Sequence, residues 1–118
     1  IKVFNRGDMF RDFTYIADII DGILSVLNIS SKHVEKDSFF EIYNIGSGRP
    51  INLSVFIEIL ESILEKKADV IFEEMQPGDV FKTFADTEKL FKKTGFRAET
   101  SFEDGIEAFV NWYKEFYK

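Results

Sequence analysis

Cysteine is absent from the sequence and histidine occurs only once, which excludes several kinds of functional site. Without cysteine there is neither a disulfide framework nor a metal site built on thiolates. The one histidine, His33, lies in the polar segment 30–38 and lacks the partners that a catalytic triad or a metal site requires. We therefore interpret His33 as a solvated surface residue and expect no metal site.

Long apolar runs are also missing. Charged residues make up 31% of the chain, and no apolar stretch reaches membrane-spanning length, so no membrane association is expected. Residues 1–10 contain Arg6 and Asp8, which do not fit a signal peptide, and we expect a cytoplasmic location. The net charge of −6 argues against nucleic-acid binding, which depends on Lys and Arg to neutralise phosphates.

Aromatic residues, by contrast, are abundant at 16% of the chain, with 14 phenylalanines. A chain of 118 residues with 45% hydrophobic content is long enough for one domain with a modest core. So many rings predict either a dense core or a surface that something else covers. Ile1 begins directly inside the strand-like run 1–4, which predicts that residues 1–118 are a fragment of a longer protein.

Hydrophobic residues recur with helical spacing in several segments, separated by short stretches typical of strands, and this alternation predicts an α/β fold. Asn52, Asp86 and the capping box Thr100–Glu103 are expected to begin helices, and Gly95 to end one. Helices are predicted over residues 16–27, 53–64, 87–93 and from the capping box to Tyr117. Strands are predicted at Val3–Phe4, Phe39–Ile45 and Asp69–Phe72.

A glycine-containing turn, Gly46-Ser47-Gly48, lies between a predicted strand and a predicted helix and superficially resembles a dinucleotide-binding fingerprint. The sixth position of that pattern is Ile51 instead of glycine, and Pro50 stiffens the turn. We interpret this segment as a structural turn.

Two polar segments admit a functional interpretation. Arg11 is either a surface cation paired with Asp12 or Asp18, or a phosphate-binding group whose guanidinium donates two parallel hydrogen bonds. The segment Gln76–Asp79 is either an ordinary Pro-Gly turn or a site where an amide and a carboxylate bind a phosphate and a ribose diol. Each segment by itself favours the structural interpretation.

Taken together and in order, these segments resemble the C-terminal third of the extended short-chain dehydrogenases/reductases that act on nucleotide sugars. The resemblance covers essentially the whole chain, and within the family it is most similar to the UDP-glucuronate 4-epimerases of capsule and lipopolysaccharide synthesis. The segments that carry it are Arg11–Ile19, Tyr43–Pro50, Gln76–Asp86, Thr94–Phe96 and Trp112-Tyr113.

The resemblance implies roles for three residues as a substrate-binding set. Arg11 matches the arginine that binds the UDP diphosphate, and Asp79 matches the carboxylate that holds ribose hydroxyls. Gln76 stands where many relatives, such as UDP-galactose 4-epimerases, have a second phosphate-binding arginine. Its amide can donate a hydrogen bond but brings no charge, a departure that resembles the glucuronate branch.

The glycine-rich NAD loop and the Tyr-x-x-x-Lys catalytic pair of the family have no counterpart here. The resemblance therefore implies that NAD and the catalytic residues belong to an N-terminal Rossmann domain, and that residues 1–118 alone bind no NAD and catalyse nothing. The parent would epimerise its sugar by transient oxidation at C4. The alternative is a non-catalytic interaction module with a Phe-rich binding surface.

Loss of a Rossmann domain would leave parts of this chain uncovered. The strand Phe39–Ile45 would expose an unpaired edge, and the helices 16–27 and 53–64 would expose apolar faces. Such surfaces favour self-association, and a homodimer is the expected form.

Overall fold

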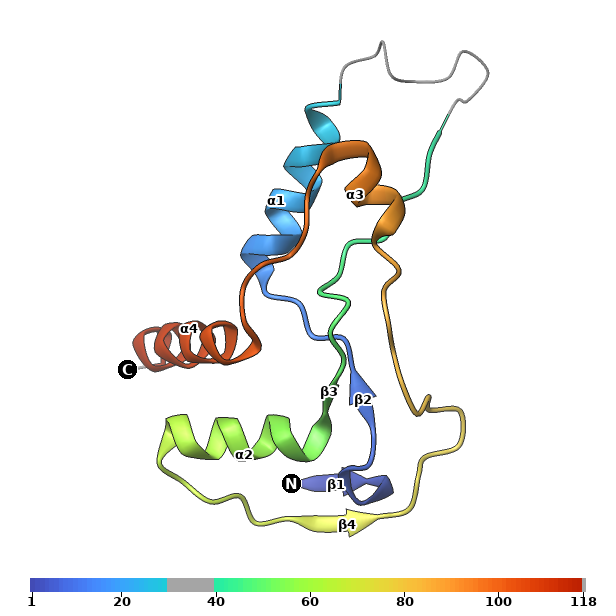
Figure 1. The fold of residues 1–118 in the computed structure, drawn as a ribbon. Helices are drawn as coiled ribbons and strands as arrows, with labels where there is room; N and C mark the ends of the chain where they lie inside the picture. Colours follow the sequence, from blue (N-terminus) through green and yellow to red (C-terminus); the bar gives the residue numbers. More distant parts are fainter. Residues whose placement is uncertain (30–39, 118) are drawn as a thin grey trace.

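The computed structural model describes residues 1–29 and 40–117, in which two small sheets and four α-helices form an α/β arrangement (Figure 1). The predicted fold class is thereby confirmed. The strands are β1 (Lys2–Phe4), β2 (Phe10–Arg11), β3 (Ile51–Asn52) and β4 (Ile71–Glu73). The helices are α1 (Ile16–Leu27), α2 (Leu53–Leu64), α3 (Glu88–Thr94) and α4 (Phe102–Phe116), with a 3-10 turn, η1, at Asn5–Gly7.

The two sheets each join strands that are distant in sequence. β1 runs parallel to β4, with Val3 opposite Phe72, and β2 runs antiparallel to β3, with Arg11 opposite Ile51. Phe10 also forms a parallel bridge with Lys82. The strand β2 therefore lies between β3 and the segment around residue 82, and Arg11 lies at the end of this junction.

The molecule is elongated and has a small core. Its radius of gyration is 17.8 Å, whereas a compact domain of this length has about 13–14 Å. Figure 1 shows α1 beside α3 at one end and α2 beside α4 at the other. Only four large hydrophobic side chains are buried among the described residues: Val3, Met9, Leu90 and Val110. The aromatic residues therefore do not form a dense core.

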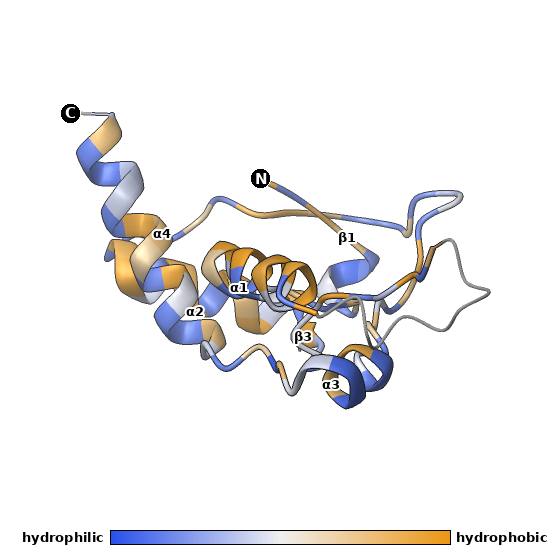
Figure 2. Cartoon of the chain, turned by 90° about the horizontal axis from the view of Figure 1, so that it is seen from above, coloured by the Kyte–Doolittle hydropathy of each residue, from blue (hydrophilic) through white to orange (hydrophobic). Residues whose placement is uncertain are grey.

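The apolar stripe of α1 faces solvent, as predicted. Figure 2 shows the hydrophobic residues along this helix. The buried positions of α1 are instead Asp18 and Gly22. In α2, Val55 is the one large hydrophobic side chain in the exposed class and the others are half-buried, so the expected uncovered face is present there only in part. The exposed side chains of α1 are Ile16, Ile20, Ile23, Leu24 and Leu27.

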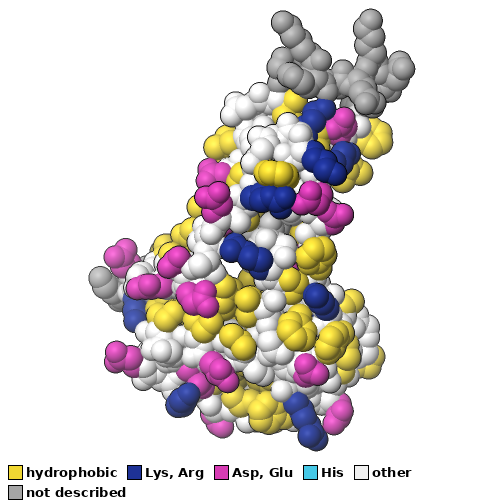
Figure 3. All heavy atoms as spheres, viewed as in Figure 1, with side chains coloured by type: hydrophobic (Ala, Val, Ile, Leu, Met, Phe, Trp, Pro, Cys, Tyr) yellow, Lys and Arg dark blue, Asp and Glu magenta, His cyan; other side chains and the backbone are white. Residues whose placement is uncertain are grey.

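A cluster of three rings joins α2 to α4. Phe13, just before α1, stacks on Phe56 of α2 with ring centroids 5.0 Å apart. Phe102, at the start of α4, lies 5.3 Å from Phe13 and 5.8 Å from Phe56. Exposed hydrophobic side chains form several patches, separated by polar and charged groups, on the side of the molecule seen in Figure 3.

The predicted strand Phe39–Ile45 is not formed: residues 40–45 have no regular secondary structure, and Phe39 lies outside the described residues. The aromatic and β-branched composition favours a strand, but a strand also needs a neighbour that accepts its ladder hydrogen bonds. In the described part of the chain, no segment pairs with residues 40–45. His33 also lies outside the described residues.

The helix ends confirm two of the predicted caps and shift two by one residue. The N-cap of α3 is Thr87 and not Asp86, although Asp86 Oδ1 still accepts from Glu88 N at 3.1 Å. Asn52 accepts a hydrogen bond from Ser54 N at 2.8 Å, and Gly95 ends α3 with a φ of 75°. The last capping box was wrong by one residue, because Ser101 is the N-cap. Its hydroxyl donates to the Asp104 carboxylate at 2.6 Å and accepts from Asp104 N at 3.1 Å. The strand predicted at 69–72 begins two residues later and ends one residue later, as β4.

Gly22 and Gly105 both lie inside helices and provide a matched pair of substitutions. A Cβ added at Gly22 would lie 2.9 Å from Ile45 Cγ2 and 3.1 Å from Phe96 Cε1. At Gly105 the nearest contact would be an ordinary 3.5 Å to Tyr15. We expect Gly105→Ala to stabilise the fold by about 0.5–1 kcal/mol through helix propensity. We expect Gly22→Ala to destabilise it by about 1–3 kcal/mol through overpacking. Urea denaturation measures both, and equal stabilisation would contradict the close packing of α1.

Candidate functional site

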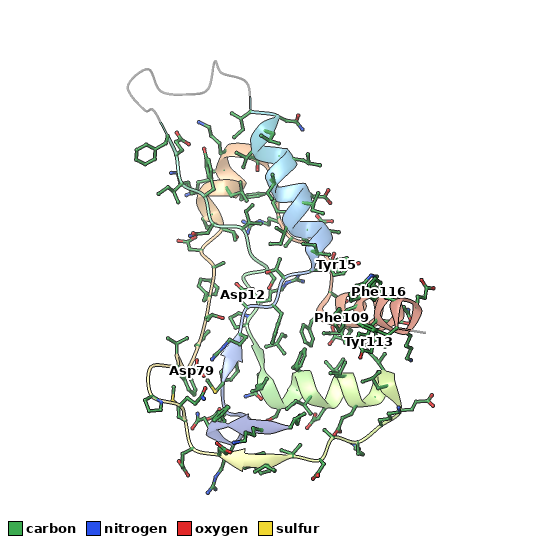
Figure 4. All side chains as sticks on the ribbon, turned by 180° about the vertical axis from the view of Figure 1, so that it is seen from behind. Asp12, Tyr15, Asp79, Phe109, Tyr113 and Phe116 are labelled. Carbon is green, nitrogen blue, oxygen red and sulfur yellow. The ribbon has the colours of Figure 1, made fainter. Side chains whose placement is uncertain are left out.

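Arg11 and Asp79 lie together although they are far apart in sequence. The guanidinium Nη2 of Arg11 donates to Asp79 Oδ1 at 2.8 Å, and the two side chains are 25% and 32% exposed. Figure 4 shows Asp79 beside β2, on the segment that crosses past this strand. Arg11 was expected to pair with Asp12 or Asp18 if it served only as a surface cation. Its observed partner is instead the other charged residue of the predicted substrate-binding set.

Backbone groups of β2 and of the segment 81–83 hold the Arg11–Asp79 pair in place. Arg11 Nη1 donates to the carbonyl of Phe10 at 2.9 Å and to that of Phe81 at 3.4 Å. Phe10 N donates to Phe81 O at 2.9 Å, and Thr83 N donates to Phe10 O at 3.1 Å. The rings of Phe10 and Phe81 meet edge to face with centroids 5.8 Å apart. The segment after Asp79 is therefore held against β2 like an additional strand.

Gln76 begins the tight turn that ends at Asp79. Asp79 N donates to Gln76 O at 3.1 Å, and Gly78 has a φ of 85°, a conformation that glycine adopts without strain. Asp79 Oδ1 also accepts from Val80 N at 2.8 Å, which holds the carboxylate in place. The Gln76 side chain is exposed and has no hydrogen-bond partner among residues 1–29 and 40–117. The turn thus places Gln76 near the pair without fixing its amide.

The Asp12 carboxylate connects several segments of the described chain through hydrogen bonds, and the sequence prediction missed this role. Its Oδ1 accepts from Ser47 N at 3.1 Å and from Ser47 Oγ at 2.6 Å. Its Oδ2 accepts from Gly48 N at 3.1 Å and from Ala85 N at 2.9 Å. The turn 46–48 therefore binds a carboxylate of its own chain, which supports its interpretation as a structural turn. The only signal in the sequence was the position of Asp12 directly after Arg11.

Asp18, in the first motif, and Arg49, just before β3, also have structural contacts. Asp18 is 8% exposed and accepts from Thr100 N at 3.2 Å and from Thr100 Oγ1 at 3.0 Å. Arg49 donates to the carbonyls of Ala98 at 3.2 Å and Thr100 at 2.9 Å. The Asp18 contacts anchor the segment before α4 to α1, and the Arg49 contacts anchor it to the segment before β3. Arg11 is thus the one residue of the motif Arg11–Asp18 whose charge faces the site.

A cleft of about 730 Å³ lies apart from this pair, between the start of α1 and α4. It is mostly apolar, and Tyr15 and Phe109, two of its lining residues, are labelled in Figure 4. Arg11, Gln76 and Asp79 do not line it. We therefore identify the candidate site by the Arg11–Asp79 ion pair and not by the cleft.

Other chemistry is sparse. In the ranges 1–29 and 40–117, no group of three His, Asp or Glu side chains is arranged to hold a metal ion. Among these residues, no helix is long and apolar enough to span a membrane. The hydroxyl of Tyr43 donates to the Glu41 carboxylate, and this bond raises the pKa of Tyr43 to about 12. Tyr43 is therefore protonated at neutral pH and is unsuited to act as a base.

Comparison with known proteins gives this site a context. No family model matches the sequence. The chain is 44% identical over 98% of its length to an uncharacterised protein of Methanocaldococcus jannaschii, of which it covers 33%. It is 40% identical, over 98% of its length, to the UDP-glucuronate 4-epimerase of Thermodesulfobacterium geofontis, of which it also covers 33%.

A solved structure gives the same relationship. The Bacillus cereus UDP-glucuronic acid 4-epimerase in complex with UDP-glucuronic acid and NAD is 32% identical, with a TM-score of 0.82. The match covers 98% of this chain and 35% of that one. The fold is therefore that of part of an NAD-dependent UDP-sugar epimerase. By sequence the chain is homologous to the UDP-glucuronate 4-epimerases, and it spans about a third of the length of the curated relatives it matches.

Removal of the Asp12 carboxylate tests whether this junction organises the site. Asp12→Ala leaves the N–H groups of Gly48 and Ala85 without their acceptor, whereas Ser47 N keeps the Thr14 hydroxyl at 3.0 Å. Each part-buried group left unpaired costs about 1–3 kcal/mol. We expect a loss of at least about 2 kcal/mol in the free energy of unfolding. Asp21→Ala, at an exposed position of α1, should change it by less than about 0.5 kcal/mol. Similar effects of the two substitutions would contradict the role of Asp12.

Proposed function

We propose that residues 1–118 are the C-terminal substrate-binding part of an NAD-dependent UDP-glucuronate 4-epimerase, which interconverts UDP-glucuronate and UDP-galacturonate. The observation that carries this proposal is the pairing of Arg11 with Asp79 across 68 residues at 2.8 Å. Homology to UDP-glucuronate 4-epimerases supports the nucleotide-sugar ligand. The chain then serves to position the substrate.

Each residue of the site has a distinct task in this proposal. The guanidinium of Arg11 binds the UDP diphosphate, because its N–H groups form a planar fork that matches phosphate oxygens. Asp79 accepts hydrogen bonds from the ribose hydroxyls, and Gln76 donates its amide N–H to a phosphate oxygen. A ligand held at these points has its sugar fixed in one orientation, which lowers the entropic cost of reaction.

NAD and the catalytic residues belong to the remaining part of the enzyme, a Rossmann domain. NAD bound there would supply the hydride acceptor and donor for transient oxidation at C4 of the sugar. The chain itself, with no Tyr-x-x-x-Lys pair, contributes no catalytic residue and binds no NAD in this proposal. The exposed stripe Ile16–Leu27 of α1 supports a partner on that side, because five large apolar side chains there lack cover within residues 1–29 and 40–117.

We further propose a cytoplasmic enzyme of polysaccharide biosynthesis, since nucleotide sugars are the activated monomers of such polymers. A second function has one observation in its favour. Phe109, Trp112 and Phe116 of α4 are 49%, 52% and 67% exposed, and such a surface fits a protein-interaction module. An interaction module would bind no UDP-sugar, so ligand titration separates the two.

Substitution of Arg11 tests the phosphate-binding role. In the full-length enzyme, we expect Arg11→Ala to weaken UDP-glucuronate binding by about 1.5–3 kcal/mol, the contribution of a charge-assisted hydrogen bond. The NAD content should not change. The matched control is Arg97→Ala, which removes another arginine paired with a carboxylate, Glu88, at 2.7 Å. Calorimetric titration measures both, and unaltered affinity in Arg11→Ala would reduce Arg11 to a structural ion pair.

The 118-residue chain by itself should form a homodimer, since two-fold pairing is the commonest way to cover an apolar surface. The edge of a strand at 39–45 no longer supports this, because residues 40–45 form no strand. The apolar face of α1 does. Light scattering at micromolar concentration should give a dimer mass, and Leu24→Lys on α1 should lower it more than Val55→Lys on α2. A monomer mass for the unmodified chain would refute the proposal.

A further inference from the structure

Because Asp79 is bound to Arg11 at 2.8 Å, the cation of the site has a negative charge as its neighbour. We infer that Asp79 makes the site selective for nucleoside diphosphates and discriminates against free phosphate and pyrophosphate. The inference rests on the proposed function, in which Arg11 binds phosphate and Asp79 binds ribose. It adds a task for Asp79, namely the exclusion of anions that carry no ribose diol.

The guanidinium of Arg11 is oriented before any ligand arrives. Nη1 is engaged by the carbonyls of Phe10 and Phe81 at 2.9 and 3.4 Å, and Nη2 by Asp79 at 2.8 Å. The carboxylate is fixed in turn by Val80 N at 2.8 Å. Both charged groups are therefore held by backbone contacts, and neither can turn away from an incoming anion without losing hydrogen bonds.

Free phosphate or pyrophosphate would encounter both a positive and a negative side chain at this site. It is attracted by Arg11, but it must also approach the Asp79 carboxylate, and like charges a few ångströms apart repel. The side chains are 25% and 32% exposed, so water screens this repulsion only in part. Displacing Asp79 from Arg11 would leave a carboxylate without its cation, which opposes binding further.

A nucleoside diphosphate can interact favourably with both residues, because it has hydrogen-bond donors as well as negative charge. Its ribose hydroxyls donate to the Asp79 carboxylate in place of Arg11 Nη2, and this nitrogen is then available to a phosphate oxygen. Ligands with both groups satisfy Arg11 and Asp79 together. Ligands with only one group leave the other residue unsatisfied, which is a strong source of discrimination.

The test uses Asp79→Asn in the full-length enzyme. Asparagine keeps the size of the side chain and an oxygen that accepts from Val80 N and Arg11, but it removes the negative charge. We expect the affinity for inorganic pyrophosphate, measured by calorimetry, to rise about five- to tenfold. The affinity for UDP should fall, and the preference of the unmodified enzyme for UDP over 2′-deoxy-UDP should largely disappear.

Glu88→Gln is the matched control, because Glu88 forms an ion pair with Arg97 at 2.7 Å away from this turn. It removes the same charge from the protein as Asp79→Asn, and it should leave all three affinities unchanged. If UDP binds the unmodified enzyme but Asp79→Asn does not bind pyrophosphate more tightly, the inference is overturned while the proposed function stands. If UDP fails to bind the unmodified enzyme, the proposed function fails and the inference with it.

Discussion

The hydrogen bonds to Asp12 hold together three parts of the chain that have little else in common. A single carboxylate accepts from Ser47, Gly48 and Ala85, so the segment after β2, the turn before β3 and the segment that leads to α3 meet at one point. Arg11, the adjacent residue, owes its position to this junction as well as to β2. Arg11, proposed to bind the ligand, and Asp12, which has a structural role, are therefore adjacent, and one cannot shift without the other.

Hydrogen bonds of this kind contribute a larger share of the stability here than in a compact domain. Only four large side chains are buried among the described residues, so the hydrophobic contribution to stability is small for a chain of this length. Asp12, Asp18 and Arg49 instead connect segments through directed bonds to backbone groups. Many of the apolar residues that would normally supply a core are instead exposed on α1 and α4.

Local signals in the sequence were sufficient for the helices and for most of their ends. The spacing of apolar residues located α1 and α2, and the residues Asn52 and Gly95 marked where a helix begins or ends. The pairing of segments that are distant in sequence could not be predicted from these local signals. Residues 40–45 have strand composition but no neighbour, and the apolar stripe of α1 carried no information about whether it would be covered. For the site, the resemblance to a family identified Arg11 and Asp79, whereas their direct contact and the role of Asp12 depend on the three-dimensional arrangement.

The pairing of β1 with β4 has a consequence for how the molecule folds. Lys2 lies opposite Ile71, and the antiparallel pair joins Arg11 to Ile51, so every strand contact requires the closure of a long loop. Such closure is slow compared with helix formation, because its entropic cost precedes any gain from the new contacts. The helices should therefore form early and the two sheets late. The Arg11–Asp79 pair would be among the last contacts to form, so a ligand that needs both residues would bind the completed fold and not a partly folded intermediate.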